Sequence, residues 1–422
     1  MDPVKSSSLD ASASLSSTLL SALRAWWLEH HGWLLRAAVA ILAVFALLKL
    51  GSEFWRLVWD SSRIAAIDLK FRHIEVQRWF AGLPVYSYRH GAVYPPATYA
   101  MLWPLVGWLN FTAARWVWAA SSVVMLAWLT WLIASRIGAD APVERAFVAL
   151  LLLSMNATGV AIGNGQLIVH CLCLLLTGLF VLRRGRRVWR EDLVAAGLIL
   201  LALMKPSITA FFFWGVLLFP GRLRPATLVV CGYIALTLFA ATFQGAGISA
   251  LITAWLQNSS GLATHGGYAD LDVWLAEAGL ARWGLPASLL ALVLLGVWTY
   301  IHRTVDVWLI LGVTSAVARL AVYHLVYDDL LMLLPMLALF RIAKRGAPAE
   351  GRDVLAGILL AIMIVIMLAP ARLQFPTSPW LPLFVTIHAV VWLVVLLFLL
   401  RQAWLDHAHV GLPLARGELA PA

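Results

Sequence analysis

Apolar stretches separated by short polar segments dominate the chain. The first runs from about Trp33 to Leu50, and twelve more follow at residues 97–109, 112–134, 146–162, 166–182, 192–204, 207–219, 226–243, 286–301, 305–320, 329–341, 354–370 and 381–400. A helix needs about 20 apolar residues to cross the hydrocarbon core of a bilayer. The pattern therefore predicts an all-α, polytopic integral membrane protein, although several runs are short.

Polar segments bound this apolar region. Residues 1–24 are rich in Ser and have no apolar core directly after a basic start, which excludes a cleavable signal peptide. We expect a disordered cytoplasmic tail over residues 1–30, one transmembrane domain over residues 31–402 and a second cytoplasmic tail over residues 403–422.

Arginine clusters between the runs predict the orientation. Cytoplasmic loops carry an excess of Lys and Arg, so the cluster Arg183–Arg187 indicates a cytoplasmic turn. Alternation then predicts further cytoplasmic turns at residues 222–224, 302–303 and 341–352.

This orientation requires that one run does not cross. With a cytoplasmic tail and thirteen crossings, Arg183–Arg187 would lie on the wrong side. The run 97–109 is short, follows Pro95-Pro96 and contains Pro104, so we expect a re-entrant or short helix there. About twelve transmembrane helices remain.

The segment between the first two runs, residues 51–98, is basic, amphipathic and rich in aromatic residues. We expect juxtamembrane helices in it, with Asp68 near the start of one. The orientation places Asp68 on the same, extracytoplasmic face as Gln166, Lys205 and His324. A carboxylate among cations at a membrane surface suits proton abstraction beside an anionic lipid headgroup.

Composition narrows the class of protein. Hydrophobic residues make up 62% of the chain and charged residues 12%, and the mean hydropathy is +0.86, whereas a soluble domain carries about 25% charged residues. The net charge of +10 comes mainly from arginine clusters between apolar runs. It indicates orientation and contact with membrane lipids, and no nucleic-acid partner. The cysteines Cys171, Cys173 and Cys231 lie in apolar runs and form no zinc pattern.

Six short motifs carry a family resemblance. They are Asp68-Leu69, Gly82-Leu83-Pro84-Val85-Tyr86, Tyr94-Pro95-Pro96, Asn164-Gly165-Gln166, Leu203-Met204-Lys205-Pro206 and Tyr323-His324-Leu325-Val326-Tyr327-Asp328. Through the order of these motifs and their expected location on one side of the membrane, the chain resembles glycosyltransferase family 87 over roughly residues 34–400. The resemblance implies a GT-C fold and a cell-membrane enzyme that transfers a single sugar, mannose-like or a pentose, from a polyprenyl-phosphate carrier to a lipid or glycan acceptor. The chain departs from the family at Lys70, Arg72 and His73, so donor and acceptor stay open.

Asp68 is the candidate general base of an inverting transfer. Such a base takes the proton of the acceptor hydroxyl while the polyprenyl phosphate leaves from the opposite side of the anomeric carbon. The alternative is that Asp68 caps a helix or pairs with Lys70 or Arg72.

The leaving phosphate and the sugar need cations and hydrogen-bond donors. His324, Lys205 and Gln166 are the first candidates; the alternatives are a structural histidine, a lysine that reaches the membrane interface, and an amide that completes a helix start. Further candidates are Arg63, Arg72, Arg319 and Tyr94. Each also has a structural interpretation: arginines in contact with headgroups, a buried pairing of Arg319 with a group such as Asp328, and a turn at Tyr94-Pro95-Pro96.

We expect neither a metal nor another cofactor. The pair Asp270-Leu271-Asp272 is a weak metal signal, because a monophosphate donor has no diphosphate for a metal to bridge. A transporter or lipid-linked sugar flippase is the main alternative function, although it would more often show inverted repeats and mid-membrane charges. A structural membrane subunit and a glycan polymerase or ligase also stay open.

Overall fold

The computed structural model describes residues 4–62, 64–88, 91–184, 188–262, 270–345, 351–369, 373 and 378–411, and these residues form helices and loops without a strand. The first half contains α1 (Val4–Val58), α2 (Ile67–Phe80), α3 (Pro96–Leu102), the π-helix η1 (Trp103–Gly107), α4 (Phe111–Arg136), α5 (Pro142–Ser154), α6 (Asn156–Asn164), α7 (Ile168–Arg183) and α8 (Trp189–Ala202). The second half contains α9 (Pro206–Thr209), η2 (Ala210–Phe212), α10 (Phe213–Leu218), α11 (Arg224–Ala241), α12 (Ile248–Leu262), α13 (Leu271–Glu277), η4 (Ala281–Trp283), α14 (Gly284–Ile301), α15 (Val307–Ala321), η5 (Val326–Met332), α16 (Leu333–Arg345), α17 (Arg352–Met367) and α18 (Leu381–Gly411).

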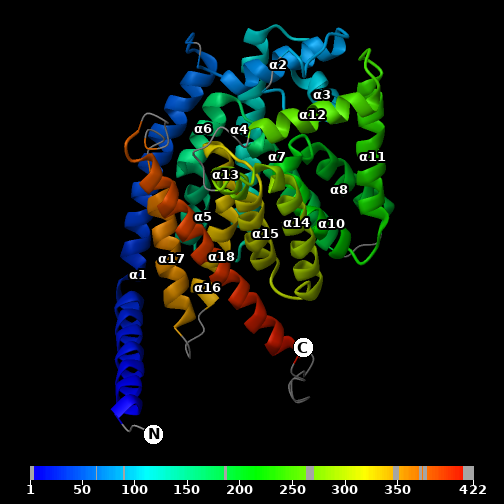
Figure 1. The fold of residues 1–422 in the computed structure, drawn as a ribbon. Coiled ribbons are helices and arrows are strands. Elements are labelled where there is room, and N and C mark those ends of the chain that lie inside the picture. Colours follow the sequence, from blue (N-terminus) through cyan, green and yellow to red (C-terminus); the bar gives the residue numbers. More distant parts are fainter. Residues whose placement is uncertain are drawn as a thin grey trace.

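The helices form one bundle with two different ends (Figure 1). Helices α2, α3 and α12 lie together at one end, which we call the α2 end. Helix α1 begins and α18 finishes toward the other end, where the loop between α14 and α15 also lies. The bundle therefore places the basic, aromatic segment 51–98 over one end of the apolar helices.

Five of the described helices are long and apolar enough to cross a membrane: Glu29–Val58, Phe111–Arg136, Arg224–Ala241, Ala281–Ile301 and Leu381–His407. Helices α5 and α6 add a sixth if their 50° bend interrupts a single span. The number of about twelve crossings is not confirmed. The predicted runs do lie on helices, but α7 and α15 have 16 and 15 residues, and 16 residues of helix measure about 24 Å against about 30 Å of hydrocarbon.

The amino-terminal segment is helical. Helix α1 begins at Val4, so residues 4–30 continue into the first span as helix. The local sequence contains Leu and Ala among its serines and has neither Gly nor Pro between residues 4 and 31, so nothing in it interrupts a helix. The cytoplasmic location of this segment stays a prediction. At the other end, α18 continues past residue 402 to Gly411.

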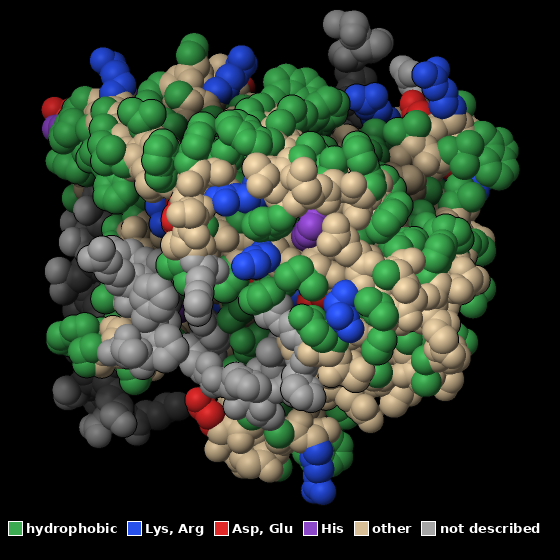
Figure 2. Space-filling view, turned by 90° about the horizontal axis from the view of Figure 1, so that it is seen from above, with side chains coloured by type: hydrophobic (Ala, Val, Ile, Leu, Met, Phe, Trp, Pro, Cys, Tyr) green, Lys and Arg blue, Asp and Glu red, His purple; other side chains and the backbone are tan. Residues whose placement is uncertain are grey.

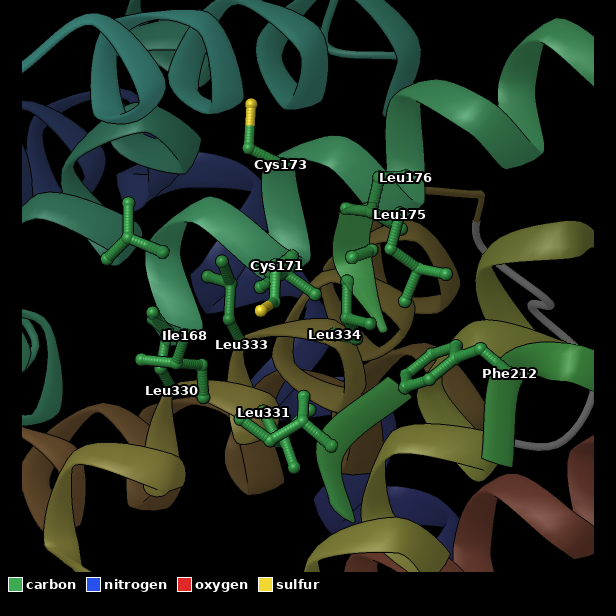
Figure 3. Packing of buried hydrophobic residues seen from close by; sticks show 14 of the residues in the cluster. Ile168, Cys171, Cys173, Leu175, Leu176, Phe212, Leu330, Leu331, Leu333 and Leu334 are labelled. Carbon is green, nitrogen blue, oxygen red and sulfur yellow. The ribbon is translucent and has the colours of Figure 1, made fainter. Parts of the chain in front are cut away.

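The core of the bundle contains helices that are apolar on every side. Figure 3 shows Ile168 and Cys171 of α7 beside Leu330, Leu333 and Leu334 of η5 and α16. All five side chains are buried. A helix that is apolar on nearly every side has to be covered by protein or lipid, and here protein covers most of α7.

The run 97–109 forms two short pieces. All seven residues of α3 are buried, and Thr98 Oγ1 donates to the carbonyl oxygen of Met204 at 2.8 Å. Pro104 follows in η1, where its missing N–H and bulky ring favour a widened turn. The short helix is thus present at the α2 end, and its entry into the bilayer stays a prediction.

Candidate functional site

The start of α2 carries Asp68 and is fixed by α6. Ala66, which precedes the helix, has φ 48° and ψ 34°, in the left-handed region. Its N–H donates to the carbonyl oxygen of Gly163 at 3.1 Å. A left-handed non-glycine residue costs on the order of 1–3 kcal/mol and persists only where its surroundings hold it. The end of α6 therefore sets the position of Asp68.

Gly165 ends α6 and brings Gln166 to Asp68. Its φ is 71°, and a Cβ there would lie 2.5 Å from the Cβ of Leu69. Only glycine accepts both the backbone conformation and this approach. The side-chain amides of Gln166 and Asn164 act on the Asp68 carboxylate as hydrogen-bond donors.

Asp68 lies among cationic and amide side chains. Removal from water raises the pKa of its carboxyl group above the usual value, and Gln166, Arg72 and Lys205 oppose this by stabilising the ionised form. Asp68 as a residue is half-buried, whereas Gln166, Arg72 and Lys205 are buried. The carboxylate is therefore largely removed from water and stabilised by polar side chains.

Lys205 and His324 meet at one carboxylate. Lys205 Nζ lies 2.5 Å from Asp328 Oδ1, and His324 Nδ1 lies 3.1 Å from Asp328 Oδ2. The other ring nitrogen of His324 lies 3.2 Å from the carbonyl oxygen of Ala318. Both nitrogens of this buried ring thus face protein acceptors, while Lys205 also lies over the ring of Tyr327, 4.7 Å from its centroid.

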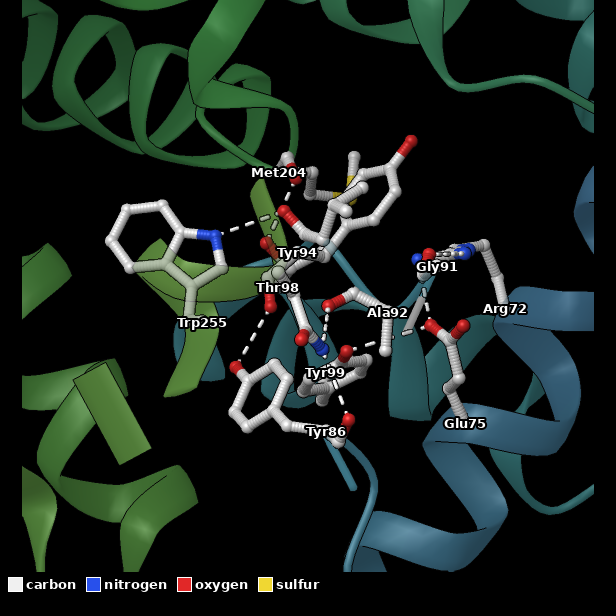
Figure 4. A network of polar contacts seen from close by, with 12 residues as sticks. Arg72, Glu75, Tyr86, Gly91, Ala92, Tyr94, Thr98, Tyr99, Met204 and Trp255 are labelled. Atoms are coloured by element: carbon white, nitrogen blue, oxygen red, sulfur yellow. Dashed lines mark hydrogen bonds and ion pairs between the residues drawn. The ribbon is translucent and has the colours of Figure 1, made fainter. Parts of the chain in front are cut away.

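Arg72 and Tyr94 form the opposite wall (Figure 4). The Arg72 guanidinium lies 4.3 Å from the centroid of the Tyr94 ring, and its Nη1 is 2.6 Å from Glu75 Oε2. Asp68 acts electrostatically on Arg72, on Tyr94 and on Tyr327. Side chains from α2, the 91–95 segment and η5 therefore lie within electrostatic range of the carboxylate.

Helix α12 holds the 91–95 segment in place. Trp255 Nε1 donates to the carbonyl oxygen of Val93 at 2.9 Å, and Asn258 Nδ2 donates to those of Tyr86 and Ala92 at 3.0 and 3.2 Å. Figure 4 shows Trp255 reaching this segment from the side opposite Arg72. The turn at Tyr94-Pro95-Pro96 is therefore structural, and it also presents Tyr94 to Arg72.

Arg319 lies in a separate contact. Its Nε is 2.7 Å from Asp329 Oδ1, and its guanidinium lies 4.6 Å from the centroid of the Trp392 ring. Asp328 was expected from the sequence as an example of a buried partner for Arg319. That example is wrong, because Arg319 pairs with Asp329, and Asp328 pairs with Lys205 and His324. Arg63, the other arginine considered for phosphate binding, lies outside the described residues, as does part of the cluster Arg183–Arg187.

The Asp270-Leu271-Asp272 pair contacts backbone. Asp270 accepts from the N–H groups of Val273 and His324, at 3.0 and 3.4 Å, and Asp272 accepts from that of Tyr323 at 3.0 Å. These bonds cap α13 and attach it to the residues that precede η5. Burial raises the pKa of the Asp270 carboxyl to about 6. In the described part of the chain, no group of three His, Cys, Asp or Glu side chains suits a metal ion.

Two contributors were absent from the sequence-based set of candidates. Asn164 belongs to the Asn-Gly-Gln motif and donates to Asp68, and Asp328 ends the last motif and binds both Lys205 and His324. The sequence signal that could have identified Asn164 and Asp328 is that each belongs to one of the six motifs. Figure 2, seen from the α2 end, shows basic side chains and a histidine within a largely hydrophobic face, as expected of a site at a membrane surface.

Comparison with known proteins identifies the family of the chain. A family model, Glycosyltransferase family 87, matches residues 92–326, which is more than half of the chain. The chain belongs to glycosyltransferase family 87. As a family 87 protein it is a membrane glycosyltransferase, with a sugar donor and an acceptor as substrates. No curated protein and no solved structure matches it.

The matched range divides the site. Gln166, Lys205, His324 and Tyr94 lie inside residues 92–326, whereas Asp68 and Arg72 precede them. The family match therefore includes most of the site residues and leaves out the two that α2 contributes.

Proposed function

We propose that this family 87 enzyme transfers a single sugar, mannose-like or a pentose, from a polyprenyl-phosphate carrier to a hydroxyl of a lipid or glycan acceptor. The observation that carries the proposal is the Asp68 carboxyl group, which two amides and two buried cations, Arg72 and Lys205, stabilise in its ionised form. A base and phosphate-binding cations are what this reaction needs.

Asp68 is the general base. Its carboxylate takes the proton of the acceptor hydroxyl as the acceptor oxygen bonds to the anomeric carbon. The bond from that carbon to the phosphate oxygen breaks, and its electron pair stays on the leaving polyprenyl phosphate. The raised pKa of Asp68 makes it a stronger base than an ordinary aspartate.

Cations compensate the charge on the phosphate. Arg72 and Lys205 flank Asp68, so the phosphate sits between them while the hydroxyl faces the carboxylate. Tyr94 and Gln166 contact the sugar. His324 has both ring nitrogens directed at protein atoms, so it acts by orienting Asp328 and, through it, Lys205. Arg319 supports the same segment through Asp329.

The site faces the extracytoplasmic side of the cell membrane. Arginines at the opposite end of the bundle support this orientation, since positive residues favour the cytoplasm. About twelve crossings would follow if the short helices traverse a locally thinned bilayer or complete spans in pairs. The prenyl chain then enters from the lipid beside α2 and α3.

The test is sugar transfer by the full-length protein in lipid nanodiscs, supplied with radiolabelled polyprenyl-phosphate mannose or pentose and a membrane-lipid acceptor extract. Wild type should transfer label, and Asp68→Asn should lose about 10²- to 10⁴-fold in rate while binding the donor normally. Asp60→Asn is the matched control, because Asp60 lies in the loop that precedes α2 and accepts from Ser62.

Other outcomes would change the assignment. Equal rates for wild type and Asp68→Asn would remove Asp68 from the chemistry. If folded wild type moved the labelled lipid across vesicles without transferring sugar, a flippase would replace the enzyme in this proposal.

A further inference from the structure

A charged cavity lies at the end of the bundle opposite α2 (Figure 1). It has a volume of about 530 Å³, and its lining includes Arg136, Arg183, Arg184, Arg341, Arg345 and one carboxylate, Asp306. Arg136, Arg183 and Arg345 come from the last turns of α4, α7 and α16, and Asp306 precedes α15. Four helices that are distant in sequence thus contribute to one cavity.

The acidic group is already occupied. Asp306 Oδ2 accepts from Arg341 Nη2 at 2.5 Å and from Arg345. The other oxygen, Oδ1, accepts from the N–H of Trp308 at 2.8 Å and caps α15. Asp306 therefore pairs directly with two of the five arginines and also caps α15.

The other three arginines have no direct ion pair among the described residues. Among the described residues, no carboxylate lies within ion-pair distance of Arg136, Arg183 or Arg184. The carboxyl ends of α4, α7 and α16 contribute about half a negative charge each. Five arginines and one aspartate give the lining an excess of four positive charges, and the three helix ends together offset less than half of it.

The cavity lies at the ends of candidate membrane spans, which indicates where its ligand comes from. The candidate spans Phe111–Arg136 and Ala281–Ile301 both end beside it, at Arg136 and just before the loop that carries Asp306. Residues at the end of a span lie at the level of the lipid headgroups. Guanidinium groups bind phosphate through paired N–H donors.

We propose that this cavity binds the phosphate group of an anionic phospholipid headgroup, separately from the glycosyl-transfer site. A soluble diphosphate shares the same chemistry, and the experiment distinguishes the two sources. The site holds the ligand through Arg136, Arg183 and Arg184, while Asp306, Arg341 and Arg345 form the fixed wall.

The test is lipid binding by the purified full-length protein, measured by native mass spectrometry after exchange into vesicles of equal phosphatidylglycerol and phosphatidylcholine. Wild type should retain phosphatidylglycerol in preference to phosphatidylcholine. Each Arg→Gln change at positions 136, 183 and 184 should weaken retention about five-fold, the effect expected of one basic residue at an anionic surface. Arg303→Gln is the matched control: this exposed arginine lies in the same loop as Asp306, and it bonds to Tyr300.

The triple variant changes Arg136, Arg183 and Arg184 to Gln together. If it retained as much phosphatidylglycerol as wild type, the proposal would be overturned. Equal retention of phosphatidylglycerol and phosphatidylcholine by wild type would overturn it as well. If the triple variant does not fold, Arg184→Gln alone gives the same test, because this side chain is exposed. In the second arm, inorganic pyrophosphate is added to protein in detergent. Displacement of phosphatidylglycerol at micromolar concentration would support the phosphate site but assign it to a soluble ligand, and no displacement at millimolar concentration would support the lipid.

Discussion

Lys205 and Asp328 are 123 positions apart in the chain, and Lys205 Nζ lies 2.5 Å from Asp328 Oδ1. The pair joins the start of α9 to η5 beneath Asp68. Burial raises the pKa of Asp328, but Lys205 and His324 outweigh burial and lower it to about 2. The pair therefore stabilises the fold above the ordinary aspartate pKa of 3.8, and this contribution is lost as the pH falls toward 2.

Replacing one member of the Lys205–Asp328 pair should lower the free energy of unfolding more than replacing both members. Lys205→Met or Asp328→Leu alone leaves an uncompensated buried charge, so we expect each to lower the free energy of unfolding by about 3–5 kcal/mol. The double variant should recover most of that loss yet stay inactive, because the cation is gone. Denaturant unfolding in detergent and sugar transfer measure the two effects. Additive losses in the double variant would contradict a direct pair.

Asp68→Asn should abolish transfer without destabilising the protein. The pKa of Asp68 is raised, so its contribution favours folding at low pH and is lost as the pH rises through the folded-state value. At neutral pH the ionised carboxylate thus costs stability, and we expect an equal or higher melting temperature for the variant. A marked decrease would instead favour the helix-cap or ion-pair interpretation.

Gln166→Leu should shift the pH dependence of transfer. Its amide stabilises the ionised carboxylate of Asp68, so losing it should raise the pKa of Asp68 further. The acid limb of kcat/KM should then move to higher pH. Gln244→Leu removes an amide that donates to the carbonyl oxygen of Trp79 at the same end of the bundle, and it should leave the acid limb unchanged. An unshifted limb in Gln166→Leu would separate that amide from the base.

Gly165→Ala should lower activity at least ten-fold. The left-handed backbone costs alanine about 1–2 kcal/mol, and the new Cβ would meet that of Leu69 at 2.5 Å, which displaces α2 and Asp68. Gly221→Ala has the same kind of strain, with φ 62°, but nothing within 4 Å of the added Cβ. Rates corrected for folded fraction compare the two. Equal losses would show that strain, not the contact with Leu69, causes the effect.

The motifs predicted the members of the site better than their contacts. Asp68, Gln166, Lys205 and His324 were expected on one face, and the structure brings Gln166 and Lys205 to Asp68 and joins Lys205 and His324 at Asp328. The polar segments between the apolar runs indicated this, because alternate segments lie on the same side of a membrane protein. The motifs did not predict the ion-pair partners of these residues. Arg319 pairs with Asp329, and Lys205 pairs with Asp328.

The hydrophobic pattern by itself determined that this is a helical membrane protein, because a chain in lipid satisfies its backbone polar groups within helices. It also determined where those helices lie along the sequence. Only the tertiary structure decided their lengths, the bend between α5 and α6, and which of two adjacent aspartates each cation meets. Adjacent positions on a helical turn point about 100–120° apart. The choice between Asp328 and Asp329 therefore depends on how η5 is rotated against α6, α7 and α15, and local sequence does not specify that rotation.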